Sequence, residues 1–567
     1  MPFGFERPIS PTKSDDAPRI RPALLAYAGV AAFFVAFIVL AWNIDREGVA
    51  APYLDPIAKL RTQDESLHIN SAITMARGGS WLTPQFMGRF FLFKPPLLLW
   101  LSAASIRIFG LSLFSVRLPA LFLGAAAVAA VFLWCAHARS FKAAVLAAGL
   151  LLLTPFWQIF SRVCLTDMPA AAFATLALTA LAFDPLLQNR RTALAFGALG
   201  GASILAKSVA GVLPFAALAI YYVLSHRGSR PRLKGIAFAA IVAVAVVSPW
   251  HLYQAWVHPH WFWADYVQVQ LLGVGLRSQA NTLFARSPLF YVTRLVQMDP
   301  VFAIFALAGV AGALRFSRLR NTPSALLAFC WTVVTVLALC AFQAKHLPYI
   351  VFLLPPLCIL GALCGPAIFQ RPPLLLPAIV VLFSVKAIAS GEVWSLRPTA
   401  PPLAGAVAMR QYCNLRRDVE LISVQPDDEF YSATLPLPTV RYCFLDPSGA
   451  IQHTIPHYAQ LGIFLTAGEF VALPQLLPRF AATLREWGLN STKPVGSAIV
   501  LRNPAEIGEI FRARPRSDFY LPSAWKAYLA NVAGTHDIFP YSESRLFLLT
   551  RESKPRVQPV PAIPARW

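Results

Sequence analysis

Apolar residues are grouped along the chain into long uninterrupted runs, without the alternation that marks a half-buried strand. Eleven runs of 14 to 23 uncharged, mostly apolar residues come before residue 390. They cover residues 23–42, 118–136, 143–160, 168–183, 192–206, 208–224, 235–250, 300–314, 323–342, 347–369 and 372–385. A helix crosses a bilayer with ~20 apolar residues. The pattern therefore predicts a mainly α, polytopic membrane protein with 11 to 13 spans, any additional spans lying in 97–110 or 251–299.

The polar pattern changes after residue 390. The stretch 391–567 contains 15 of the 27 carboxylates and short β-like segments at 420–424, 462–466, 498–501 and 545–550. A helix-like segment at 474–487 lies between them. Mixed strands and helices of this length predict a soluble C-terminal α/β domain that can bury its own core.

Cations in the short loops predict the orientation, because loops rich in Lys and Arg stay in the cytoplasm. The cation-rich loops contain Arg139 with Lys142, Arg190 with Arg191, Arg227 to Lys234, Arg315 to Arg320, and Arg371. The alternate loops carry only Arg162, Lys207 and Lys345. We therefore expect a cytoplasmic tail at 1–22 and a membrane domain at 23–390, with outer loops at 43–117 and 251–299. The number of spans is expected to be odd, which places 391–567 outside. The run 23–42 is too long for the apolar core of a cleavable signal.

Composition supports the membrane class. Of the 567 residues, 57% are hydrophobic and only 13% are charged, against roughly 25% charged in soluble domains. The mean hydropathy of +0.57 excludes a disordered chain. The net charge of +22 arises mainly from the short links between apolar runs, which indicates membrane topology more than nucleic-acid binding.

Carboxylates are scarce in the membrane part. Only Asp167, Asp184, Asp265 and Asp299 lie between Ser66 and Gly391. An ionised group in such a stretch is costly and calls for a reason. Asp184 and Asp299 each precede a proline and are interpreted as helix-boundary residues.

Two loops combine carboxylates with features suited to sugar transfer. The first contains Asp64 and Glu65, followed by Gly78-Gly79-Ser80-Trp81 and by Lys94-Pro95-Pro96; the second runs from Ser161 to Pro169 and contains Asp167. A carboxylate beside an acceptor can act as a general base. A solvated loop explains Asp64 and Glu65 equally simply, and a helix N-cap explains Asp167.

Lys94, Lys207 and Lys345 stand alone on the side where the topology rule disfavours cations. Ammonium groups at helix ends can bind the phosphate of a polyprenyl phosphate. Each lysine by itself is also explained by snorkelling to the membrane surface. Together, the three favour a phosphate site.

The stretch 64–119 resembles the first outer loop of bacterial GT-C glycosyltransferases, within the protein mannosyltransferase-like superfamily and nearest to the lipid A aminoarabinose transferases. The resemblance rests on the Asp-Glu pair, the Gly-Ser-Trp turn and Lys-Pro-Pro. It continues in Leu165 to Pro169, in Leu205-Ala206-Lys207 with Pro214, in Lys345 to Tyr349 with Pro355-Pro356, and in an outer C-terminal domain.

The resemblance implies roles for individual residues. Asp64, Asp167 and Glu65 correspond to catalytic carboxylates, while Lys94, Lys207, Lys345 and Arg162 correspond to donor-phosphate ligands. His68, His346 and Tyr349 are expected to contact substrate. Two departures concern the choice of substrate: Leu67-His68 stands where the relatives carry Arg-Tyr, and Ser208-Val209 follows Lys207 where Gly-Pro is common.

Other chemistry is weakly indicated. His258, His260 and Asp265 in loop 251–299 resemble a divalent-metal set, although a Trp-rich membrane belt explains the same loop. The eight cysteines show no metal spacing; Cys413 and Cys443 share the exported domain, where an oxidising compartment permits a disulfide.

These observations favour an inverting glycosyltransferase of the bacterial inner membrane, acting as a monomer with its site facing the periplasm. It would use a polyprenyl (undecaprenyl) phosphate sugar and a lipid or other envelope acceptor, without nucleic acid and with no required cofactor, since the donor carries its own activated bond and no nucleotide motif is evident. The alternatives are a protein O-mannosyltransferase-like enzyme, a secondary transporter, for which two similar halves are expected, and a scaffold protein with an exported domain.

Overall fold

The protein is described from a computed structural model. It describes residues 22–42, 44, 60–86, 89–259, 262–263, 266–267, 270–271, 287–314, 319, 322–342 and 345–365 of the membrane part. Beyond these it describes 420–424, 440–445, 499–501, 503–514, 516–522, 536–537 and 546–550.

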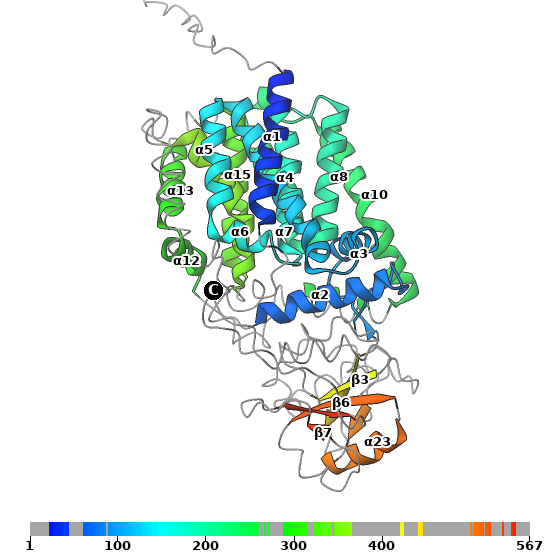
Figure 1. Ribbon diagram of the computed structural model, residues 1–567. Helices are drawn as coiled ribbons and strands as arrows, with labels where there is room; N and C mark the ends of the chain where they lie inside the picture. The colour runs from blue at the N-terminus through cyan, green and yellow to red at the C-terminus, as the bar shows by residue number, and fades with distance from the viewer. Residues whose placement is uncertain are drawn as a thin grey trace, which may run out of the picture.

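A helical bundle forms the first two thirds of the chain (Figure 1). Its principal helices are α1 (Pro22–Ala41), α4 (Leu113–Ala138), α5 (Phe141–Leu153), α7 (Asp167–Phe183), α8 (Arg190–Lys207), α9 (Leu213–Leu224), α10 (Leu233–Val257), α13 (Pro300–Ala313), α15 (Pro323–Ala341) and α16 (Leu354–Cys364). Each predicted apolar run up to 347–369 corresponds to one of these helices, in some cases together with a short helix next to it in the chain. The run 372–385 lies outside the described residues.

Six helical segments are long and apolar enough to cross a membrane, and α5, α7 and α13 are among the shorter apolar helices. The prediction of a mainly α, polytopic membrane protein is confirmed. Several spans are completed by short elements: α6 (Pro155–Phe160) extends α5, η2 (Ser208–Val212) joins α8 to α9, and η6 (Leu347–Phe352) precedes α16. The number of spans between 11 and 13 stays a prediction.

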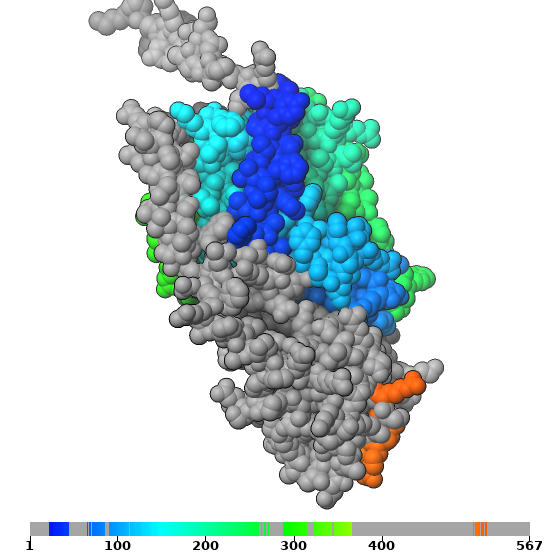
Figure 2. Space-filling view, viewed as in Figure 1, coloured from blue at the N-terminus to red at the C-terminus, as the bar shows by residue number. Residues whose placement is uncertain are grey.

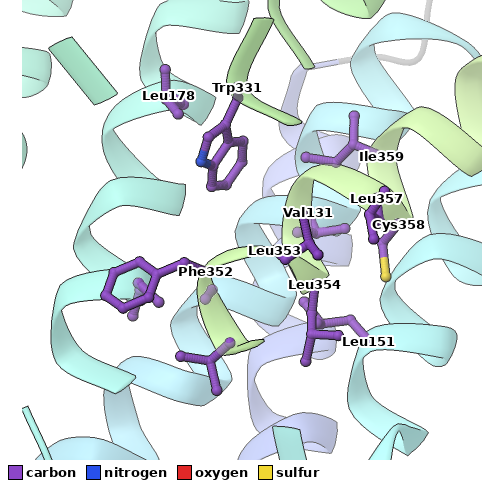
Figure 3. Packing of buried hydrophobic residues seen from close by; sticks show 14 of the residues in the cluster. Val131, Leu151, Leu178, Trp331, Phe352, Leu353, Leu354, Leu357, Cys358 and Ile359 are labelled. Atoms are coloured by element: carbon purple, nitrogen blue, oxygen red, sulfur yellow. The ribbon is translucent and has the colours of Figure 1, made fainter. Parts of the chain in front are cut away.

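The centre of the bundle is formed by α4 and by η6 with α16, whose apolar stretches are 78% and 83% buried. The apolar stretches of α1 and α10 are only 17% buried and present apolar side chains outward, as helices facing lipid do. Figure 2 shows α1 on the surface of the bundle. In the core, side chains from α4, α5, α7, α15 and α16 meet around Trp331, Leu354 and Cys358 (Figure 3). Trp331 stacks on Trp134 of α4 with ring centroids 6.3 Å apart.

Polar residues fix the ends of these helices. Ser112 and Ser115 form a capping box that begins α4, Ser140 accepts the Ala143 N–H at the start of α5, and Asn189 accepts the Arg191 N–H at the start of α8. Asp299 accepts the Phe302 N–H at the start of α13. The sequence interpretation of Asp299 as a helix-boundary residue is confirmed.

Short elements gather at one end of the bundle, which we call the α2 end. They include α2 (Leu60–Ala76), the hairpin of β1 (Gln85–Phe86) and β2 (Arg89–Phe90), α3 (Leu97–Phe109) and α12 (Phe290–Met298). Figure 1 shows α2, α3 and α12 at this end, with the C-terminal strands beyond them. Neighbouring helices alternate in direction, so the loops after α4, α7 and α9, which are the cation-rich ones, lie at the opposite end.

The C-terminal part contains a six-stranded sheet with the order β5-β4-β3-β6-β8-β7. Its strands are β3 (Glu420–Val424), β4 (Val440–Leu445), β5 (Ile499–Leu501), β6 (Ser517–Pro522), β7 (His536–Asp537) and β8 (Leu546–Thr550), with α23 (Ile507–Ala513) between β5 and β6. Strands β5, β4, β3 and β6 pair in parallel. Strand β8 is antiparallel to both of its neighbours, β6 and β7. The strands expected at 420–424, 498–501 and 545–550 correspond to β3, β5 and β8. The expected strand 462–466, the helix 474–487 and Cys413 lie outside the described residues, so the Cys413–Cys443 disulfide stays a prediction.

Candidate functional site

Asp167 begins α7 at the α2 end. It lies in the first turn, where the helix dipole favours a negative charge, and only 4% of its surface is exposed. Its Oδ1 accepts a hydrogen bond from Lys207 Nζ, forming a buried ion pair. A cation therefore compensates the one carboxylate that the sequence places at the start of this helix.

The backbone after Lys207 is strained. Lys207 is the last residue of α8, and Ser208 adopts φ +26°, a conformation that residues with a side chain rarely take. The chain then folds back as η2, where a Cβ at Gly211 would lie 2.3 Å from the Ser203 carbonyl oxygen. Strain of this kind often accompanies functional sites. Here it breaks the helix directly after Lys207 and leaves this residue at the helix end, beside Asp167.

Aromatic residues from later in the chain complete this cluster. Lys207 Nζ lies 4.1 Å from the centre of the Tyr349 ring, a cation–π contact. The Tyr349 ring is 5.3 Å from that of His346, and Tyr291 of α12 donates its hydroxyl to the His346 carbonyl at 3.1 Å. Burial first, and then the charge of Asp167, raise the pKa of Tyr291, which keeps it a neutral donor.

Glu65 connects α2 to three other segments. Its carboxylate accepts two hydrogen bonds from Arg117 of α4, with Nε–Oε1 at 2.8 Å and Nη2–Oε2 at 3.1 Å. Oε1 also accepts the Cys164 N–H at 3.0 Å, and Arg117 Nη1 donates to the Ile44 carbonyl at 3.0 Å. Glu65 and Arg117 are 2% and 1% exposed. These contacts are those of an anchoring carboxylate, and the catalytic role that the resemblance implied for Glu65 stays a prediction.

Asp64 precedes Glu65 within α2. Its side chain lies outside what the structure describes, so the expectation that it lines the site stays a prediction. The Glu65 contact to Cys164 nevertheless brings this turn of α2 to the loop that ends at Asp167, three residues later. The two predicted catalytic loops therefore meet in space.

Lys94 lies near the same end of α8. Leu92, two residues before it, is fully buried and packs with Leu205 of α8 and Trp250 of α10. The Lys94 side chain is partly buried. Its ammonium has no hydrogen-bond or ion-pair partner within the part of the chain that the structure describes, and this leaves it available to an anion.

Lys345 and Arg162 bind backbone carbonyls, and their expected role at the donor phosphate stays a prediction. Lys345 Nζ donates to the carbonyls of Leu339 at 2.6 Å and Cys340 at 3.1 Å, and also to that of Phe342, which caps the end of α15. Burial lowers its pKa. Arg162 Nε and Nη2 donate to the carbonyls of Leu40 and Val39 at the end of α1, at 3.0 and 2.9 Å. Both cations bind the last carbonyls of a helix, as basic residues at helix C-termini do.

The Gly-Ser-Trp turn is held by donors that the sequence did not indicate. Gly78 has φ +110°, which suits glycine. Trp100 Nε1 donates to the Trp81 carbonyl at 2.6 Å. The Leu82 carbonyl accepts Trp250 Nε1 at 2.9 Å and Gln254 Nε2 at 2.5 Å, both from the end of α10. The end of α10 thereby fixes the first outer loop, a contact across about 170 residues that no local pattern reveals.

The remaining candidates are dispersed. His68 is buried in α2 with its ring edge-on to Phe91, 5.8 Å between centroids. His258 contacts Phe90 at 4.5 Å, and burial lowers its pKa, whereas His260 and Asp265 lie outside the described residues. Within the described ranges, no group of three His, Cys, Asp or Glu side chains could hold a metal ion. The metal set stays a prediction.

Sequence reasoning missed Arg117 and Tyr291. Arg117 had a signal, because it is a lone cation shortly after the outer loop and precedes Leu118-Pro119 at the start of a long apolar run. Tyr291 had none, because one tyrosine near a membrane surface is ordinary.

Comparison with known proteins identifies sequences similar to this chain. Residues 93–253 match the family model described as dolichyl-phosphate-mannose-protein mannosyltransferase. An undecaprenyl phosphate-alpha-4-amino-4-deoxy-L-arabinose arabinosyl transferase of Sodalis glossinidius is 25% identical over 53% of this chain and 54% of its own length. The corresponding transferase of Pectobacterium carotovorum is 26% identical over the same shares. The chain thus spans about half the length of the curated relatives it matches.

Similarity of fold extends further than similarity of sequence. The crystal structure of ArnT from Cupriavidus metallidurans bound to undecaprenyl phosphate superposes with a TM-score of 0.65 at 16% identity, covering 94% of this chain and 98% of that one. The archaeal oligosaccharyltransferase AglB from Archaeoglobus fulgidus gives a TM-score of 0.50 at 14% identity. The chain has the fold of ArnT, and in sequence it resembles the undecaprenyl phosphate-aminoarabinose arabinosyl transferases.

Proposed function

We propose that this protein is an inverting membrane glycosyltransferase that moves a sugar from a polyprenyl phosphate to a lipid A-like or other envelope acceptor. The observation that carries the proposal is the meeting of Asp167, Lys207, Tyr349 and the Glu65 turn of α2 at one end of the bundle. A carboxylate and an ammonium at the end of membrane helices supply the groups that a transfer from a lipid phosphate requires. The curated relatives are named for this reaction with undecaprenyl phosphate-aminoarabinose.

The proposed roles follow from the contacts. Asp64 orients or deprotonates the acceptor, and Asp167 holds Lys207 toward the donor. Lys94 and Lys207 bind the phosphate leaving group, Tyr349 holds the Lys207 ammonium, and His68 and His346 border the substrate. Lys345 and Arg162 act by fixing the ends of α15 and α1, which support this site.

The proposed setting is the bacterial inner membrane, with the α2 end in the periplasm. Residues 1–22 form a cytoplasmic tail, 23–390 the membrane domain and 391–567 a periplasmic α/β domain. The short cation-rich loops at the opposite end support this orientation. We propose that the chain acts as a monomer and requires no cofactor. Activity before and after EDTA treatment tests the alternative in which His258, His260 and Asp265 bind a divalent metal.

The family-model match to dolichyl-phosphate-mannose-protein mannosyltransferases supports a second candidate, transfer to protein. Mass spectrometry of envelope lipids and glycoproteins from a deletion strain distinguishes the acceptors. A sugar missing from lipid A supports the first candidate, whereas a sugar missing from protein supports the second.

Transfer by the purified enzyme tests the reaction itself. With a polyprenyl-linked sugar and a lipid acceptor, Asp64→Asn should express normally and lose activity by about 10²- to 10⁴-fold, the usual contribution of a positioned base. Asp184→Asn is the matched control, because Asp184 ends α7 at the opposite end and accepts the Asn189 N–H at 2.7 Å. Near-normal turnover by Asp64→Asn would contradict the enzyme assignment and favour the transporter.

A further inference from the structure

The α2 end contains a buried four-way junction formed by Glu65, Arg117, the Cys164 N–H and the Ile44 carbonyl. The guanidinium and the carboxylate make two parallel hydrogen bonds, a geometry with strong orientational preference. Each of the two side chains also bonds a backbone group of a different segment. The junction therefore joins α2, α4, the end of α1 and the loop before α7.

Burial makes this junction rigid. Glu65 and Arg117 are almost completely enclosed, so neither charge can turn to water without losing its compensation. Both Glu65 oxygens and three Arg117 nitrogens form hydrogen bonds of 2.8 to 3.1 Å. Nearby packing adds to the constraint, because Ile69, Ile73, Leu98, Val116 and Cys164 form one buried apolar cluster.

We infer that Glu65 and Arg117 are positioning residues that set the distance between Asp64 and Asp167. This inference rests on the proposed function. Asp64 directly precedes Glu65 in a helical turn, and Asp167 follows Cys164 by three residues, so the Glu65–Cys164 hydrogen bond links the backbones that carry the two predicted catalytic carboxylates. The Glu65 carboxylate itself is occupied and takes no proton from the acceptor.

The contacts of the phosphate side are separate from this junction. Asp167 begins α7 and is bound by Lys207 at the end of α8, and Tyr349 lies in η6; none of these three elements contributes a residue to the four-way junction. Loss of the junction should therefore displace the turn of α2 that carries Asp64, which reduces turnover and leaves donor-phosphate affinity nearly unchanged.

Two substitutions test the inference. Arg117→Lys keeps the positive charge but removes the two-pronged guanidinium, and Glu65→Gln keeps a hydrogen-bond acceptor but removes the negative charge. We expect kcat to fall roughly 10- to 100-fold per folded molecule, because an error of about 1 Å in position costs up to ~10²-fold. The dissociation constant for undecaprenyl phosphate should change less than about twofold. Arg139→Lys is the matched control: Arg139 also binds backbone carbonyls, those of Ala362 and Leu363, but at the opposite end of the bundle.

A combined variant separates positioning from general support of the fold. In an Asp64→Asn background, Arg117→Lys should cause no further loss of kcat, because the residue acts through Asp64. An additive loss, or a kcat for Arg117→Lys equal to that of the wild type, would overturn the inference.

Hydrogen exchange provides a readout that is independent of transfer. Arg117→Lys should accelerate amide exchange in 60–70 and 162–167 by about tenfold or more relative to α13, and Arg139→Lys should not. Unchanged exchange in these segments would overturn the inference even if activity fell. Absence of transfer by the wild-type enzyme would count against the proposed function alone, since the exchange result still decides whether the junction positions α2.

Discussion

The side chains at the α2 end differ in whether a protein partner already satisfies their charge. Asp167 and Lys207 compensate each other, as do Glu65 and Arg117. Lys345 and Arg162 are occupied by helix carbonyls. Lys94 has no such partner within the described residues, which makes it the cation whose contribution to phosphate binding can be measured most directly.

Lys94→Met should weaken binding of undecaprenyl phosphate by about tenfold or more, since hydrogen bonds to charged groups contribute about 1.5–3 kcal/mol. Stability should hardly change, because no group among the residues that the structure describes loses a partner. A binding titration and a thermal melt measure the two effects. Lys234→Met, at the start of α10 near the opposite end, is the control. Equal affinities for Lys94→Met and the wild type would exclude Lys94 from the phosphate site.

At the scale of elements, the site depends on where helices stop. Lys207 lies beside Asp167 because α8 ends in a strained turn, and Tyr349 reaches Lys207 because α15 ends before a short loop and η6. Lys345 fixes that end of α15 through the carbonyls it binds. Lys345 thus stabilises the C-terminal end of α15, close to the Tyr349–Lys207 contact.

Lys345→Met should lower the stability of the bundle by about 1–3 kcal/mol, because it leaves buried carbonyls without a donor. We expect a lower thermal midpoint, with donor-phosphate affinity per folded molecule reduced less than by Lys94→Met. Thermal unfolding in detergent and a binding titration measure both quantities. An unchanged midpoint together with a large loss of affinity would restore Lys345 as a phosphate ligand.

At the scale of the whole molecule, the helix directions place α2, α3, α12 and the C-terminal strands at one end of the bundle (Figure 1). The short cation-rich loops lie at the other end. Under the positive-inside rule, this arrangement separates a cytoplasmic face from a face that carries both the candidate site and the sheet.

Reporter fusions test this orientation. A periplasmic reporter such as alkaline phosphatase should be active when fused after residue 400 and inactive when fused within 227–234. A cytoplasmic reporter should give the opposite result. Activity only in the cytoplasm after residue 400 would contradict both the odd number of spans and a periplasmic site.

The sequence by itself determined the class of the protein, the positions of the helices and the residues from which a site can be built. These follow from local properties: an apolar run forms a helix because every backbone group must be satisfied in lipid, and a carboxylate is noticed because it is rare there. The strands at 420–424, 499–501 and 546–550 were recognisable from another local property, a short β-like segment in a polar stretch.

Tertiary structure decided which of those residues act together. Glu65 and Arg162 were predicted as site residues from the loops that carry them, yet their partners come from segments about a hundred to a hundred and twenty residues away. Arg117, Tyr291 and the α10 contacts to Leu82 became evident only in three dimensions. A charged residue is visible in a sequence, but whether another part of the protein already binds that charge depends on the tertiary structure. A charge that is already bound holds segments together, whereas a charge without such a partner can bind substrate.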